Sequence, residues 1–343
     1  MKKVKYAILL LFVLLIVVAV TLFPVSSFLD YNAPLNSDNI IVEGWLQACE
    51  LEQINEKCRN INELIVVGNE FRQNTDTRER LFDYFGKQVS KEKSGKEMWL
   101  YANSTLIFNP ELFNLKEAGD TLKIVVRARG TKANGRFAHF NLIVNGKFYN
   151  GSFSAGEMRD YIFNVETGGA GLKTLGIRFD NDCGSSQEDR NLFVYSVTVN
   201  FERITVNKNT ALITTLENRF TTGFASKAEA AMNYLKALNV KAKNYRAVSF
   251  KLARENQTLA AANSFREWVG TKDLRKFNIV SAGIHSRRSW ITYKRVLGND
   301  YRIGIISLKS MRYNKNNWWK STGGWFGLID EFFSYIVNRI NVE

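Results

Sequence analysis

The chain is poor in cysteine, proline and histidine: its 343 residues include 3 Cys, 3 Pro and 2 His. With so few cysteines and histidines, and no pair at a zinc-ligand spacing, a zinc site is excluded. Cys49 and Cys58 fall on opposite faces of a predicted helix, so they are poor disulfide partners, and Cys183 stands alone in an acidic loop. A hydrophobic content of 45% excludes a disordered chain.

The N-terminus combines lysines with a long uncharged stretch. Lys2, Lys3 and Lys5 precede residues 6–29, which carry no charge. Residues 6–23 are apolar and have about the length that a helix needs to cross a bilayer. We expect a retained anchor, residues 1–29, with the N-terminus in the cytoplasm. This predicts a single-pass protein of the inner membrane whose domains are periplasmic. The alternative is a cleaved signal peptide, although no Ala-x-Ala-like site follows the apolar stretch.

The net charge of +14 belongs to one part of the chain. Residues 207–343 hold 23 Lys and Arg against 9 Asp and Glu, whereas residues 1–206 hold 24 of each kind. Outside the cytoplasm, such a basic region favours a phosphorylated or acidic partner. Nucleic acid is not expected as a partner.

Residues 38–95 and 207–343 alternate buried strands with helices. Strands are expected at 39–42, 64–68, 277–281 and 301–307, and helices at 46–59, 230–238, 257–269, 285–297 and 324–340. This alternation predicts an α/β domain with a Rossmann-like parallel sheet.

Residues 97–206 follow a different pattern and predict an inserted domain. Short strands, expected at 99–101, 122–128, 140–144 and 161–165, are separated by Gly and Asn turns. No convincing helix interrupts them, and Asn145-Gly146 is a hairpin signal. The pattern indicates an all-β sandwich of the jelly-roll type. Trp99 and Tyr101 lie on one of its strands, and we expect them in the core.

An acidic loop, residues 179–192, joins two strands of this insert. It carries Asp180, Asp182, Glu188 and Asp189 among amide and hydroxyl side chains. Calcium prefers such oxygen ligands, so these four residues are candidate metal ligands. A solvated acidic turn is the alternative.

Ligands of open parallel sheets bind beyond the carboxyl ends of the strands. Glu43 follows the first predicted strand, and His285, Arg287 and Arg288 follow the strand at 277–281. The start of a helix with basic side chains favours an anion. Here too a solvated helix start is the alternative.

Several segments of the α/β part resemble the YdcF/SanA/ElyC family of envelope-associated proteins. They are 41–45, 226–230, 256–258, 279–281 with 285–288, and 318–319. The resemblance covers about half the chain and implies a role in envelope glycan or lipid-linked sugar metabolism. The family's motifs fall here on Glu43, Ser226, Thr258, His285 and Arg288, so the resemblance implies a pocket at these positions more than a reaction. If the domain is an enzyme, we expect His285 as the acid/base, Arg288 as the anion contact and Glu43 as a second carboxylate. Arg287 adds positive charge at the same helix start, and Ser226 and Thr258 are further candidate anion contacts. Glu43-Gly44-Trp45 stands where many members have a Gly-rich turn, so a phosphate contact of that turn does not transfer.

The insert is similar to calcium-dependent, xylan-binding carbohydrate-binding modules. Segments 126–130, 138–140 and 144–146, with the loop at 180–192, carry the similarity. The resemblance implies a calcium ion held by Asp182 and Asp189, with weaker matches at Asp180 and Glu188. Open positions on that ion would take sugar hydroxyls.

Together these observations predict a membrane-anchored protein that binds polysaccharide through calcium. The α/β domain, with no evident cofactor, would act on a phosphorylated or lipid-linked sugar. The alternative is a non-catalytic glycan-binding receptor or envelope scaffold. The sequence leaves open which of the two applies.

Overall fold

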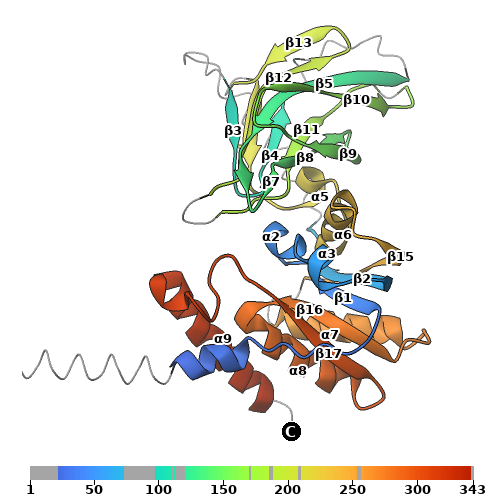
Figure 1. Cartoon of the computed structure of the whole chain (residues 1–343). Coiled ribbons are helices and arrows are strands. Elements are labelled where there is room, and N and C mark those ends of the chain that lie inside the picture. Colours follow the sequence, from blue (N-terminus) through green and yellow to red (C-terminus); the bar gives the residue numbers. More distant parts are fainter. Residues whose placement is uncertain are drawn as a thin grey trace, which may run out of the picture. The chain divides into compact units, whose positions relative to one another are not determined.

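The computed structural model describes residues 22–72, 97–109, 112, 120–169, 171–184, 188–207, 210–252 and 256–340. The chain forms two compact units (Figure 1). The α/β unit contains the described residues up to Leu46, Gln53–Val67 and those from Val240 onward. The sandwich unit contains Gln47–Glu52 and Gly68–Asn239.

The α/β unit is built on a five-stranded sheet in the order β15-β2-β1-β16-β17. Its strands are β1 (Asn39–Glu43), β2 (Ile61–Asn69), β15 (Ala242–Phe250), β16 (Lys276–Ala282) and β17 (Arg302–Leu308). Strand β1 pairs in parallel with β2 and β16, and β16 pairs in parallel with β17. Ile41, Ile65 and Ile279 are fully buried, as central parallel strands covered on both faces require. The predicted parallel sheet is confirmed.

The helices of this unit pack on the sheet and on one another. They are α3 (Ile54–Lys57), α7 (Gln257–Val269), the single turn η2 (Gly283–His285), α8 (Ser286–Leu297), η3 (Trp318–Lys320) and α9 (Thr322–Ile340). Phe265 of α7 and Tyr293 of α8 share one hydrophobic core with the strands. The fold therefore places the N-terminus of α8 directly after the carboxyl end of β16.

The sandwich unit contains two five-stranded antiparallel sheets. One has the order β10-β5-β12-β13, with β3 also paired to β12, and the other has the order β14-β4-β11-β8-β9. The first comprises β3 (Met98–Leu100), β5 (Thr121–Gly130), β10 (Arg159–Glu166), β12 (Leu192–Val199) and β13 (Glu202–Thr205). The second comprises β4 (Thr105–Phe108), β8 (His139–Val144), β9 (Lys147–Phe153), β11 (Leu175–Phe179) and β14 (Ala211–Thr214). A short hairpin, β6 (Lys132–Ala133) with β7 (Arg136–Phe137), lies beside them in the sequence.

Alternation of apolar and polar residues explains this architecture. In β5, Leu122, Ile124 and Val126 are fully buried, while the residues between them are exposed or half-buried. Phe140 and Phe179 of the second sheet belong to the same core cluster. Two sheets that share one core form a sandwich, as the sequence predicts for this region.

Three short helices complete the sandwich unit: α2 (Ala48–Leu51), α5 (Arg219–Thr222) and α6 (Lys227–Ala237). The single helix predicted over 46–59 is wrong. Helices α2 and α3 replace it, because the chain leaves the sandwich unit after Glu52, whose side chain is buried there. Strand β15 was not predicted. Its buried residues are Val248 and Phe250 at its end, so the strand lacks a longer alternating apolar pattern.

Within the described ranges, no helix is both long enough and apolar enough to cross a membrane. The anchor predicted at residues 1–29 lies mostly outside those ranges. Its last part, residues 22–29, is helical.

Candidate functional site

A pocket of about 520 Å³ lies on the sandwich unit beside the acidic loop. Carboxylates, an amide and two aromatic rings meet there. Its lining residues are Trp99, Tyr101, Ala102, Asp182, Asp189 and Asn191.

The aromatic side of this pocket comes from β3 and the turn that follows it. Trp99 is 52% exposed and Tyr101 is 49% exposed, and their ring centroids lie 5.8 Å apart. Phe193 of β12 stacks on Trp99 at 14° and 6.4 Å, and the guanidinium of Arg129 covers Phe193 at 4.2 Å. The expectation that Trp99 and Tyr101 are core residues is wrong. Side chains alternate along a strand, and the buried residue of β3 is Leu100, so Trp99 and Tyr101 point outward.

The turn after Tyr101 is tied to the acidic loop. Ala102 and Asn103 adopt the left-handed conformation, with φ of 51° and 49°. This turn lets the amide oxygen of Asn103 accept a hydrogen bond from the backbone N–H of Asp182 at 2.7 Å. The aromatic and acidic walls of the pocket are therefore connected directly.

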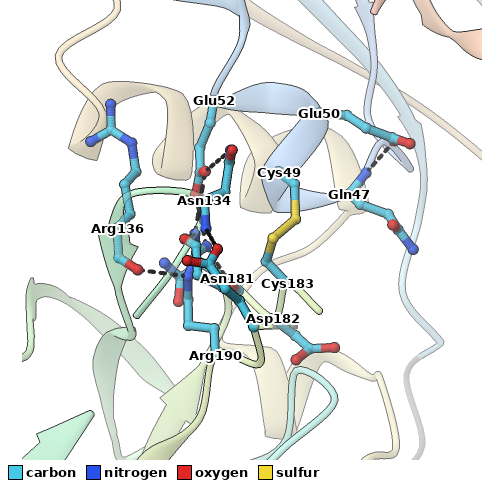
Figure 2. The surroundings of a disulfide bond; sticks show 12 residues. Gln47, Cys49, Glu50, Glu52, Asn134, Arg136, Asn181, Asp182, Cys183 and Arg190 are labelled. Atoms are coloured by element: carbon cyan, nitrogen blue, oxygen red, sulfur yellow. Dashed lines mark hydrogen bonds and ion pairs between the residues drawn. A yellow bond between two sulfur atoms is a disulfide. The ribbon is translucent and has the colours of Figure 1, made fainter. Parts of the chain in front are cut away.

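A disulfide joins the acidic loop to helix α2. Cys183 bonds to Cys49, 134 positions earlier in the chain, with the two Cα atoms 5.8 Å apart. In Figure 2 the neighbouring carboxylate of Asp182 points away from the polar group around Arg190. The disulfide thus fixes one side of the loop, next to Asp182, which lines the pocket.

Buried charge fixes the other side of the loop. The guanidinium of Arg190 is fully buried and lies 2.7 Å from the carboxylate of Glu52 (Figure 2). It also donates to the carbonyl oxygens of Asn181 and Arg136 at 2.7 and 3.1 Å. The hydroxyl of Tyr234 donates to Glu52 at 2.6 Å. Burial, together with the Glu52 charge, raises the pKa of Tyr234 well above its ordinary value, so this hydroxyl stays protonated.

The four candidate metal ligands of the loop divide into two pairs. Asp182 and Asp189 line the pocket. Asp180 instead lies 2.8 Å from Nδ1 of His139 and accepts a hydrogen bond from Asn141. Glu188 accepts a hydrogen bond from the backbone N–H of Asn134 at 2.8 Å. The structure therefore brings two of the four to one place.

The donor set of the pocket suits a hard cation. Asp182 and Asp189 supply carboxylate oxygens and Asn191 an amide, the groups that calcium prefers over nitrogen or sulfur ligands. The amide N–H of Asn191 donates to Asp189 at 2.8 Å, so its oxygen faces another direction. Among the described residues, which omit 185–187 of this loop, no three His, Cys, Asp or Glu side chains cluster as a metal site. The pocket thus offers part of a calcium ligand set.

A second polar cluster lies at the carboxyl ends of β1 and β16 in the α/β unit. Glu43 is fully buried, and its carboxylate accepts hydrogen bonds from the hydroxyls of Ser281 at 2.6 Å and Ser289 at 2.7 Å. Nε2 of His285 is 3.8 Å from the same carboxylate. Within the described part of the chain, that Nε2 atom has no hydrogen-bond partner. The structure therefore places His285 beside Glu43, the two candidate catalytic residues.

Helix α9 adds a carboxylate to this cluster that sequence reasoning missed. Glu331 lies 3.0 Å from Nδ1 of His285, and Arg288 binds it through Nε and Nη2. Burial alone would raise the pKa of Glu331, but His285 and Arg288 hold it at about 2. Burial alone would lower the pKa of His285, but the charges of Glu331 and Glu43 raise it above its ordinary value. The cluster therefore places the imidazole of His285 between two carboxylates that favour its charged form.

The other predicted anion contacts lie elsewhere. The Arg287 guanidinium stacks over Phe28 and Tyr31, at 3.9 and 4.1 Å from the ring centroids. Thr258 is buried in the first turn of α7. Ser226 caps α6 in the sandwich unit, where its hydroxyl accepts a hydrogen bond from the N–H of Glu229 at 3.2 Å. Ser226 therefore caps a helix, and Arg287 binds the segment around residues 28–31.

Comparison with known proteins identifies part of the sandwich unit. Residues 123–213 match the family model CBM60, described as a Ca-dependent carbohydrate-binding module, xylan-binding. The predicted carbohydrate-binding module is thereby confirmed. The match includes the acidic loop and begins after Trp99 and Tyr101, which lie outside it.

Whole-chain comparisons add little. The solved structure of a family two carbohydrate esterase from Cellvibrio japonicus is similar over 70% of this chain and 96% of that chain. The identity is 8% and the TM-score is 0.21, which is too low to carry an argument. No curated protein matches the chain. These comparisons do not show the YdcF/SanA/ElyC family, which stays a prediction for the α/β unit.

Proposed function

We propose that the sandwich unit binds a xylan-type polysaccharide through a calcium ion held by Asp182 and Asp189. One observation carries this proposal: both carboxylates line the same pocket as the exposed rings of Trp99 and Tyr101. The acidic side of this pocket belongs to the region that matches the xylan-binding family.

The chemistry of each wall supports this function. Calcium takes six to eight oxygen ligands, so two carboxylates leave positions for a pair of neighbouring sugar hydroxyls. Calcium supplies attraction for those neutral hydroxyls, which the carboxylates alone would bind weakly. Exposed aromatic rings offer an apolar surface of the kind that ligand pockets use to bury a ring. The two walls would thus bind the edge and the face of one sugar.

The test is gel-retardation binding of the full chain to soluble xylan, with calcium and with a calcium chelator. We expect binding in calcium, loss on chelation, and loss in Asp189→Ala. Asp160→Ala is the matched control, because Asp160 is an exposed carboxylate that pairs with Arg127 and does not line the pocket. Binding that survives both chelation and Asp189→Ala would refute the calcium proposal.

We further propose that the α/β unit binds an anionic, glycan-linked ligand at His285 and Arg288. The observation that favours this site is that Nη2 of Arg288 and Nδ1 of His285 lie 3.0 Å apart at the carboxyl end of β16. The test is titration of the full chain with a water-soluble polyprenyl phosphate. We expect weaker binding in Arg288→Gln and unchanged binding in Arg266→Gln, a control on α7. Equal affinities would support the alternative, a scaffold without an anion site. Turnover that is lost in His285→Asn would add a catalytic role.

We place the protein in the inner membrane, anchored by residues 1–29 with its domains outside the cytoplasm. The lysines before the apolar stretch support this orientation. A protease added outside spheroplasts should digest the C-terminus. Protection of the C-terminus would overturn the orientation.

A further inference from the structure

Helix α9 has two faces of different character. Leu328, Glu331 and Tyr335 are buried against the α/β unit. The opposite face is apolar and exposed. It consists of Phe326 (74% exposed), Ile329 (39%), Phe333 (60%), Val337 (52%) and Ile340 (67%).

These five side chains, the α9 face, form one continuous stripe. They follow one another at intervals of three and four residues, the spacing of one side of an α-helix. At about 1.5 Å per residue, the stripe is roughly 20 Å long. A cavity of about 560 Å³ lies along it, lined by Phe326, Gly327, Ile329, Asp330 and Phe333. Contiguous apolar surface of this kind marks a binding surface rather than ordinary solvent exposure.

The position of α9 next to residues 22–29 indicates what covers this face. Phe23 lies 5.5 Å from Trp318, and Phe28 lies 5.3 Å from Tyr335 of α9, both measured between ring centroids. Leu29 is fully buried in the same cluster as Leu328. The helical segment 22–29 begins at the end of the apolar stretch 6–23 and overlaps it by two residues. Eight helical residues span about 12 Å, so α9 is held close to the point where that stretch ends.

The composition of α9 suits the surface of a bilayer more than its interior. Trp319 of η3 and Trp325 of α9 are only partly buried, and tryptophan is enriched at the boundary between lipid and water. Asp330 is exposed next to the α9 face, so its carboxylate would have to remain among the headgroups. A helix with one apolar face and polar neighbours lies in the plane of the interface.

We propose that the α9 face docks on the surface of the bilayer that holds the N-terminal anchor. The proposal rests on the proposed anchor at residues 1–29. The anchor and α9 together would fix the orientation of the α/β unit relative to the membrane, because a single helix leaves rotation free and a second contact removes it.

The test uses one thiol on the α9 face. Phe333→Cys in the full chain is labelled with a polarity-sensitive fluorophore and reconstituted into phosphatidylcholine/phosphatidylglycerol vesicles. Native thiols do not compete, because Cys58 is buried and Cys49 and Cys183 form a disulfide. Ala247→Cys is the matched control, because Ala247 is exposed on the edge strand β15. We expect lipids brominated near the headgroup to quench the label at 333 severalfold more than the label at 247.

Each outcome has a distinct meaning. A chain that floats with the vesicles but shows equal quenching at 333 and 247 overturns the docking of α9 and leaves the anchor intact. A chain that does not float overturns both proposals. Oxidation of unlabelled Phe333→Cys to a disulfide-linked dimer, without quenching by lipid, would assign the face to a second copy of the chain and overturn the lipid proposal.

Discussion

Arg190 and Glu52 form an ion pair that is shielded from solvent, with Nη1 of Arg190 2.7 Å from Oε1 of Glu52 and side-chain exposures of 0% and 3%. Glu52 follows helix α2, and Arg190 belongs to the acidic loop. Because neither charge can reach water, each depends on the other and on the surrounding hydrogen bonds. The pair therefore fixes the position of the loop that carries Asp189.

Replacing Arg190 with methionine should destabilise the sandwich unit by about 3–5 kcal/mol, because Glu52 would be left charged and buried. Arg127→Met is the control: Arg127 and its partner Asp160 are 43% and 51% exposed. Loss of that exposed pair should lower the free energy of unfolding by less than about 1 kcal/mol. Urea unfolding followed by pulse proteolysis measures both changes. Equal losses in the two variants would mean that the buried pair is not what holds the loop.

Replacing Trp99 with alanine should weaken xylan binding by about tenfold or more, because the pocket loses one aromatic wall. Phe201→Ala removes an aromatic ring that is 100% exposed and absent from the pocket lining, and it should leave the affinity unchanged. Isothermal titration with xylo-oligosaccharides in calcium gives both affinities. If both variants bind the oligosaccharides with the affinity of the natural chain, Trp99 does not contribute to sugar binding.

Thiol counting tests the disulfide. The chain has 3 cysteines, of which Cys49 and Cys183 are paired. Burial raises the pKa of Cys58 to about 12, so the folded protein should show almost no reaction with Ellman's reagent at pH 8. One thiol should react after unfolding without reductant, and three after unfolding with prior reduction. Three reactive thiols without reduction would exclude the bond.

Stability should depend on pH through the contact between His285 and Glu331. The lowered pKa of Glu331, about 2, gives a contribution that is present above its ordinary pKa and is lost as the pH falls toward 2. The raised pKa of His285 gives a contribution that is present below pH 6.5 and is lost as the pH rises through the raised value. The cluster should therefore stabilise the α/β unit most between about pH 4.5 and 6.5.

Glu331→Gln should flatten this profile and remove roughly 3 kcal/mol near pH 5.5. Asp330→Asn, at the exposed neighbouring position of α9, should leave the profile unchanged. Thermal unfolding of the full chain between pH 3 and 9 makes the comparison. If the pH profile of stability keeps its shape in Glu331→Gln, the pH dependence does not come from this cluster.

Periodicity was sufficient to predict most of the framework. Helix α7 begins and ends where its apolar spacing predicts, at Gln257 and Val269. The run Phe277–Ser281 predicts β16 because central parallel strands are apolar on both faces. These signals are local, and so they can be read from a single sequence.

The rest depended on contacts between distant parts of the chain. Cys49 and Cys183 are 134 positions apart, and no local pattern pairs them. Glu331 reaches His285 only because α9 packs beside α8. Alternation along Trp99-Leu100-Tyr101 predicts that Trp99 and Tyr101 share a face, but only the structure shows that Leu100 is the buried residue.

The disulfide between Cys49 and Cys183 closes a covalent ring through all the peptide bonds between these residues. A protease that cuts once anywhere inside this ring cannot separate the chain into two molecules. On a gel without reductant the nicked protein would still run as a single species, and only reduction would release the fragments. Strand β1 of the α/β unit and the strands that follow Cys183 would thus stay in one molecule after a single cut, which would divide a chain without this disulfide into two.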